Sequence, residues 1–131
     1  MELKRKEQTY KGKTIEELQK LEVREFAELV SSRQKRTILR NFQEIEEFIN
    51  RAKKTLKNGR KIRTHKRHLV IVPQLVGMKL HVYNGHVFVP FEVTLDMLGH
   101  RFGEFSVTRV KAKHTKTGVG ATKGSKAKSK K

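Results

Sequence analysis

The chain has 131 residues and no cysteine, which limits it to one small domain with appendages and excludes both disulfide bridges and thiolate zinc sites. No stretch is apolar over the length of a membrane-spanning helix, so we expect a cytoplasmic protein without a membrane partner. Its 31 Lys and Arg outnumber 13 Asp and Glu, and the formal net charge of +18 favours a polyanionic partner, of which nucleic acid is the expected one.

Residues 1–56 carry nearly balanced charge, with 14 Lys and Arg and 10 Asp and Glu, and show the apolar spacing of helices. Residues 14–30 form the first expected helix, because apolar side chains recur on one face and Thr14 and Glu17 stand in capping-box register. We expect one amphipathic helix here, with its apolar face packed on the rest of the domain.

Two further helices are predicted before the strongly basic part of the chain. The first covers residues 31–41, begins at cap-forming serines and offers Ile38 and Leu39 as apolar contacts. Its basic face comprises Arg33, Lys35, Arg36 and Arg40. The second covers residues 41–59, stops at Gly59 and carries three glutamates near its start. Sequence-specific DNA binding by these helices is an alternative function. The glutamates argue against it, because they lie where a recognition helix would meet bases and phosphates and would be repelled.

Residues 57–131 are strongly basic, with 17 Lys and Arg against 3 Asp and Glu, and their apolar residues follow strand patterns. Residues 69–73, LVIVP, predict a short strand, and residues 79–93 predict two strands joined in a hairpin. Asn84 and Gly85 are typical of the type I′ turn, whose two central residues need positive φ. We therefore expect an α+β fold with a small mixed three-stranded sheet and short helices.

Two glycines after the predicted sheet mark tight bends. Thr94 can cap a single helical turn that Gly99 ends, and Gly103 permits a second bend further on. The expected organisation has three parts: a helical N-terminal extension (1–59), an α+β RNA-binding core (60–113) and a basic flexible C-terminal tail (114–131).

Catalytic and metal-binding alternatives fail on spacing. The closing stretch HTKTGVGATKGSKAKSKK mixes glycine, threonine and lysine, but Lys123 precedes Gly124 and no helical pattern follows, which argues against a nucleotide-binding P-loop. Glu92, Asp96 and Glu104 are the only carboxylates after residue 56, and their positions do not predict a catalytic pair. Because the six histidines lack the spacing of a metal site, we expect no metal. Because the P-loop order and a carboxylate pair are also missing, we expect no enzymatic activity, no cofactor and no small-molecule substrate.

Two basic runs without an acidic residue, residues 57–68 (KNGRKIRTHKRH) and residues 109–131, are the candidate RNA-binding segments. Lys and Arg on irregular backbone can follow the phosphate path of folded RNA, whereas the alternative for any charge run is a solvated surface. Glycines in the second run either let the backbone approach RNA or only make a flexible linker. We expect residues 114–131 to be disordered in the free protein and ordered on RNA.

The stretch NGHVFVPFEVTLDMLGHRFGEFSVT, residues 84–108, resembles the signature of the universal small-subunit ribosomal protein S nineteen family. Upstream, IRTHKRHLVIVPQLVGMKLHVYNG is similar to the basic segment, first strand, turn and hairpin of that family. TYKGKTIEEL, SRQKR and KHTKTGVGAT resemble the extension and tail of its archaeal and eukaryotic branch. The chain departs from that branch at His68, where an acidic residue is usual, and in its lysine-rich end.

The resemblance implies a structural constituent of the small ribosomal subunit, bound in the head to the three-prime major domain of its ribosomal RNA. It implies ribosomal protein S thirteen as a neighbour, near a bridge to the large subunit, and a tail that can approach the decoding region, with contact to transfer RNA left open. The residues it assigns to RNA are Arg60, Lys61, Arg63, His65, Lys66, Arg67, His100, Arg101, Arg109, Lys111, Lys113, His114, Lys116 and Lys123. It assigns turns to Asn84, Gly85, Gly99 and Gly103.

Overall fold

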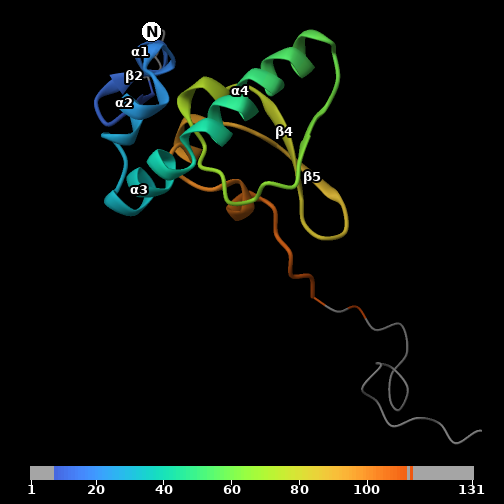
Figure 1. Ribbon diagram of the computed structural model, residues 1–131. Coiled ribbons are helices and arrows are strands. Elements are labelled where there is room, and N and C mark those ends of the chain that lie inside the picture. The colour runs from blue at the N-terminus through green and yellow to red at the C-terminus, as the bar shows by residue number, and fades with distance from the viewer. Residues whose placement is uncertain (1–7, 112, 114–131) are drawn as a thin grey trace, which may run out of the picture.

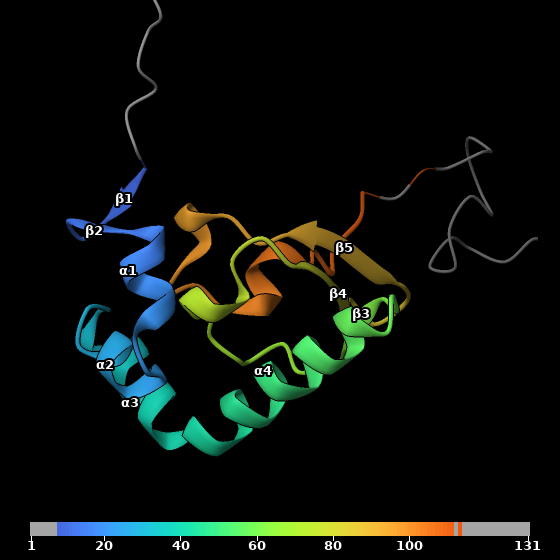
Figure 2. The same ribbon diagram turned by 90° about the horizontal axis from the view of Figure 1, so that it is seen from above.

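The computed structural model describes residues 8–111 and 113. The strands and α-helices of this part are β1 (Thr9–Tyr10), β2 (Lys13–Thr14), α1 (Ile15–Lys20), α2 (Val23–Ala27), α3 (Ser32–Arg40), α4 (Phe42–Lys57), β3 (Ile62–Thr64), β4 (Lys79–Tyr83) and β5 (Phe88–Glu92). Three short 3-10 helices, η1 (Pro73–Leu75), η2 (Leu95–Met97) and η3 (Phe102–Phe105), complete it. Figures 1 and 2 show α1, α2 and α3 at one end of the molecule and the β4–β5 hairpin at the other, with α4 running between them. The predicted α+β class is confirmed.

Three strands form the larger sheet, in the order β3-β4-β5. β3 pairs parallel with β4, and β4 pairs antiparallel with β5, so the prediction of a small mixed three-stranded sheet is confirmed. The position predicted for its first strand is wrong, because β3 lies inside the basic run and not at residues 69–73. Leu69 to Val72 are at most 1% exposed, and their backbone pairs instead with the loop after β5. There Ile71 N–H donates to His100 O at 2.8 Å, and Phe102 N–H donates to Leu69 O at 3.0 Å.

The predicted hairpin between β4 and β5 is confirmed, but its turn is not type I′. Tyr83 is paired with Phe88, so four residues connect the strands. Gly85 has φ +98°, whereas Asn84 does not have positive φ. The Asn84 side chain organises the loop instead, because its Oδ1 accepts hydrogen bonds from the backbone N–H groups of His86 at 2.9 Å and Val87 at 2.8 Å. Such side-chain-to-backbone bonding is a second reason why asparagine favours turns.

A second hairpin, β1–β2, was not expected from the sequence. Thr9 is paired with Thr14 and Tyr10 with Lys13, which leaves a two-residue turn. Its central residues, Lys11 and Gly12, have φ +53° and +79°, as a type I′ turn requires of both. Lysine is an uncommon residue in this conformation, so the sequence carries no strong signal for the turn.

The single helix predicted over residues 14–30 is wrong, because the chain forms α1 and α2 there. The capping box at its start is confirmed, since Glu17 Oε2 accepts from the backbone N–H of Thr14 at 3.0 Å. The backbone then becomes extended at Leu21 and Glu22. Glu22 starts α2 with a second capping box, in which Glu25 Oε2 accepts from the N–H of Glu22 at 3.0 Å.

The two other predicted helices are confirmed as α3 and α4. Ile38 is fully buried, as expected, but the predicted apolar contact of Leu39 is wrong, because that side chain is 46% exposed. Beyond α4, Gly59 has φ +64°, which fits its predicted role as a stop.

One apolar core joins α1, α2, α3 and α4 to the inner face of the sheet and to the loop after β5. The rings of Phe48 on α4 and Phe102 in that loop lie 5.1 Å apart at its centre. The core thus contains residues from both sides of position 60, and the division into parts 1–59 and 60–113 stays a prediction. The tail expected at 114–131 lies outside the described residues.

Candidate nucleic-acid interface

The outer face of the sheet gathers cationic and aromatic side chains. Alternation along β3 buries Ile62 and Thr64 in the core and turns Arg63 to the opposite side. Register places Arg63 beside His81 on β4, and Tyr83 at the end of β4 beside Phe88 on β5. We call the group Arg63, His65, Tyr83 and Phe88 the sheet face.

The rings of the sheet face contact one another. The His65 ring lies 4.7 Å from that of Tyr83 and 5.1 Å from that of Phe88, and the latter two are 5.1 Å apart. The Arg63 guanidinium carbon lies 5.5 Å from the centre of the Phe88 ring. Aromatic rings beside a guanidinium are the means by which proteins stack unpaired bases of single-stranded RNA.

A basic hollow of about 400 Å³ adjoins the sheet face at the start of β3. It is lined by Leu56, Gly59, Arg60, Lys61, Ile62, Lys79, His81 and Pro90. Burial lowers the pKa of His81, and the charges of Lys61, Lys79 and Arg63 lower it further. The lowered pKa favours the neutral form of this histidine, and the lysines and arginines around it supply the positive charge of the hollow.

Arg67 is turned into the fold. Its Nη1 donates to the carbonyl of Tyr83 at 2.7 Å, and its Nη2 donates to those of Gly103 at 2.9 Å and Ser106 at 2.7 Å. This guanidinium thereby joins the end of β4 to the turn after β5. A Cβ at Gly103 would lie 3.2 Å from both the Cβ and the carbonyl oxygen of Arg67. Gly103 lies in the 3-10 turn Phe102–Phe105, where the chain bends as expected, but it lacks positive φ, so close packing against Arg67 is what favours glycine there.

Lys66 and His68, on either side of Arg67, hold Glu44 of α4. Lys66 Nζ lies 2.8 Å from Glu44 Oε1, and His68 Nε2 lies 2.9 Å from Glu44 Oε2. Hydrogen bonds from these two side chains lower the pKa of Glu44. One of the glutamates that argued against DNA recognition is thus bound to the basic run.

His100 and Arg101 follow Gly99, and their side chains contact different neighbours. Gly99 has φ +80°, which fits the bend predicted there. His100 Nδ1 lies 2.7 Å from Glu104 Oε2. Arg101 is half-buried and donates from Nη2 to Thr37 Oγ1 of α3 at 3.4 Å. The structure therefore brings Arg101 to α3 and not to the sheet face.

Three cations follow the core on exposed chain: Arg109, Lys111 and Lys113. The start of their segment is tied to the hairpin loop, because Asn84 Nδ2 donates to the carbonyl of Val107 at 3.4 Å. His114, Lys116 and Lys123 lie outside the described residues, as does the predicted disorder of 114–131.

Tyr83 and Phe88 are the candidate interface residues that the sequence analysis missed. Tyr83 ends β4, in which Leu80 and Val82 are buried and alternate with outward side chains, and Phe88 is paired with Tyr83 across the hairpin. The period of two along residues 79–83 was therefore the available signal. Among the residues that the structure describes, no helix is long and apolar enough to cross a bilayer, and no group of three or more histidines and carboxylates could hold a metal ion.

Comparison with known proteins identifies the family. The family model described as Ribosomal protein S19 matches residues 32–114. Small ribosomal subunit protein uS19 of Methanococcoides burtonii is 42% identical over 120 residues, which cover 92% of this chain and 86% of the relative. The protein of the same name from Saccharolobus solfataricus is 42% identical over 120 residues, which cover 88% and 86%. The chain belongs to the ribosomal protein S19 family and is of its archaeal type.

Proposed function

We propose that this chain, a cytoplasmic ribosomal protein of the small subunit and not an enzyme, binds small-subunit ribosomal RNA through its sheet face. The observation that carries the proposal is the contact of His65, Tyr83 and Phe88 beside Arg63. The opposite side of these strands is buried in the core, so the rings are held in place before RNA arrives. A rigid platform loses little side-chain freedom on binding.

The exposed cations around the platform supply the contacts to phosphates. Arg60 and Lys61 precede β3, and Arg109, Lys111 and Lys113 follow the core. Each phosphate that they neutralise releases counterions, which makes the binding dependent on salt. Arg67 acts from inside, because it positions the end of β4 on which Tyr83 stands.

The location within the subunit is the finer part of the proposal. We place the chain in the head, on the three-prime major domain of the RNA, with ribosomal protein S thirteen beside it. His114, Lys116 and Lys123 would extend the basic surface toward the decoding region and transfer RNA. These assignments rest on the resemblance of residues 84–108 and on the excess of positive charge after residue 57.

A matched pair of phenylalanine substitutions on β5 tests the sheet face. Phe88 belongs to that face, whereas Phe91 lies 5.4 Å from Phe105 on the other side of the strand. Phe88→Leu removes a stacking surface worth roughly 1–3 kcal/mol, which corresponds to about 5- to 150-fold in affinity. We expect this loss on a transcript of the three-prime major domain, measured by filter binding of the full chain. Phe91→Leu should retain the affinity of the unaltered chain; equal affinities for the two variants contradict the assignment.

Native sedimentation tests the assembly. In lysate with magnesium, the chain should follow the small-subunit peak before and after a moderate-salt wash. Its loss into soluble or chromatin fractions after the wash would contradict stable binding to ribosomal RNA.

A further inference from the structure

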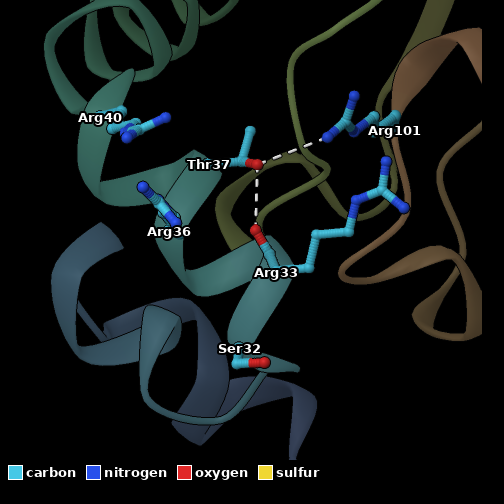
Figure 3. A pocket seen from close by; sticks show the side chains of 6 residues that line it. All are labelled: Ser32, Arg33, Arg36, Thr37, Arg40 and Arg101. Atoms are coloured by element: carbon cyan, nitrogen blue, oxygen red, sulfur yellow. Dashed lines mark hydrogen bonds between the residues drawn. The ribbon is translucent and has the colours of Figure 1, made fainter.

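α3 lies at the end of the molecule away from the β4–β5 hairpin (Figures 1 and 2), and it carries a second basic surface. Arg33, Arg36 and Arg40 recur at intervals of three and four residues, which places them on one side of the helix. Arg101 reaches the same place from the turn after Gly99. With Ser32 and Thr37, these four arginines line an open hollow of about 620 Å³ (Figure 3).

The arrangement of Arg101 is fixed by a short chain of hydrogen bonds. Thr37 Oγ1 donates to the carbonyl of Arg33 at 3.0 Å, so its lone pair is free to accept from Arg101 Nη2 at 3.4 Å (Figure 3). A guanidinium from a distant turn is thereby held against α3, next to Thr37 and Arg33, before any ligand binds (Figure 3). This preorganisation lowers the entropy lost when the hollow takes a ligand.

Among the residues that the structure describes, no carboxylate forms an ion pair with the guanidinium groups of the hollow. The six residues that line the hollow include no carboxylate either. Four like charges around one hollow repel one another, which destabilises the folded chain until an anion binds. The hollow therefore favours a ligand with several negative charges.

The lining favours RNA phosphates over an acidic protein surface. Arginine, serine and threonine side chains line the hollow, without a large apolar or aromatic side chain to serve as an anchor. Protein interfaces usually have such an anchor at their centre. Planar guanidinium groups match the oxygen pairs of phosphates, and hydroxyls add hydrogen bonds to them.

We infer that Arg33, Arg36, Arg40 and Arg101 form a second RNA site, which binds the phosphates of a segment distinct from the one on the sheet face. The inference rests on the proposed function and adds to it that the chain ties two RNA segments together. The two sites differ in chemistry, since the hollow offers only phosphate contacts and the sheet face also offers rings for bases.

Hydroxyl-radical footprinting tests this inference. The probe is a transcript of the three-prime major domain of Methanococcoides burtonii small-subunit RNA with the full chain bound. Arg36→Gln and Arg40→Gln alter exposed side chains on α3, so the core stays intact. Lys53→Gln on α4 is the matched control, because it removes the same charge from an exposed position outside both surfaces.

The two hollow variants should lose protection of one set of nucleotides, and Phe88→Leu should lose protection of a different set. Each hollow variant should also reduce the log–log salt slope of binding by about 1, and Lys53→Gln should not. If the hollow variants and Phe88→Leu lose protection of the same nucleotides, the inference of a second RNA segment is overturned. Full protection in the hollow variants with loss in Phe88→Leu overturns it too, but leaves the proposed function standing.

Two more results would overturn the inference. If neither class of variant loses protection, the second RNA site falls together with the proposed function. If the hollow variants keep all RNA protection but lose binding of polyglutamate, the hollow is a site for an acidic protein and not for RNA.

Discussion

Residues 60–65 and residues 66–68 belong to one basic run, but their side chains face different surroundings. The cations of the first group are exposed, and Arg63 among them lies over an aromatic ring on the sheet face. In the second group, Arg67 donates to three backbone carbonyls, and its two neighbours hold Glu44. Cations that are adjacent in the sequence therefore differ in role: the inner group joins segments of the chain, whereas the outer group is exposed and, under the proposed function, contacts RNA.

A charge run therefore cannot be assigned to a ligand as a whole. A surface cation changes stability little and binding much, whereas a cation enclosed by carbonyl oxygens does the reverse. The outer and inner groups can be separated by comparing the free energy of unfolding with the affinity for RNA.

The largest effect should come from Arg67→Met. Methionine keeps an apolar stem but removes the Arg67 donor from the part-buried carbonyls of Tyr83, Gly103 and Ser106. Gly103 O still accepts from the Ser106 N–H at 3.4 Å, and each carbonyl left unsatisfied costs about 1–3 kcal/mol. We expect urea denaturation to show a loss of about 3 kcal/mol or more, up to failure to fold. Arg63→Met, the control on the outer group, should stay within about 0.5 kcal/mol. Similar losses in both variants would remove the distinction between the groups.

The next largest loss of stability should come from two glycines, one in contact with Arg67 of the inner group and one directly before the outer group. Gly103→Ala would set a Cβ 3.2 Å from Arg67, and this overpacking should cost about 1–3 kcal/mol. Gly59 precedes the outer group, has φ +64° and has open space around it, so Gly59→Ala should cost about 1 kcal/mol through backbone strain.

Asparagine separates these two causes. It tolerates positive φ, so Gly59→Asn should be more stable than Gly59→Ala. Its larger side chain should make Gly103→Asn less stable than Gly103→Ala. Thermal unfolding of the four variants shows at each site whether the alanine or the asparagine variant is more stable. If asparagine is the more stable replacement at both sites, the assignment of Gly103 to close packing is contradicted.

A smaller effect, dependent on pH, should come from Glu44→Gln. Because Lys66 and His68 lower the pKa of Glu44 in the fold, its ionised form stabilises the protein above the unfolded pKa, near 4.5. The pair is partly exposed, so we expect about 0.5–1 kcal/mol in favour of the unaltered chain at neutral pH. This advantage should disappear as the pH falls through the lowered pKa. Glu46→Gln, at an exposed position on the same helix, should show no such pH dependence in thermal unfolding.

The sequence predicted local structure best where one residue type controls the backbone. Gly59 ends α4, and Thr14 and Glu17 form their capping box, because each effect depends on a few neighbouring residues. The break at Leu21 was missed because that leucine continues the helical spacing, although Glu22 and Glu25 repeat the capping register. The sequence did not reveal β3, because cations surround its short apolar pattern. Residues 69–72 are buried on all sides, and a continuous apolar run does not distinguish a strand from irregular chain.

The candidate site was only partly predictable. The exposure of Arg63 followed from alternation along β3, once that strand was known. The inward direction of Arg67 could not be read from the sequence, because its three acceptors lie 16, 36 and 39 residues away. The contact of Arg101 with Thr37 on α3, across 64 residues, could not be read from the sequence for the same reason.

The smallest effect, and the one opposite in sign, should come from Lys61→Gln. Lys61 is exposed and adjoins Arg60 in a chain with net charge +18, so its removal relieves repulsion in the free protein. We expect the free energy of unfolding to rise by about 0.2–0.5 kcal/mol at low salt, and the gain to vanish near 1 M salt, where the screening length falls to about 3 Å. The affinity for RNA should fall in the same variant. A loss of stability that salt does not alter would instead place Lys61 with the inner group, because only a cation bound within the fold stabilises the chain independently of screening.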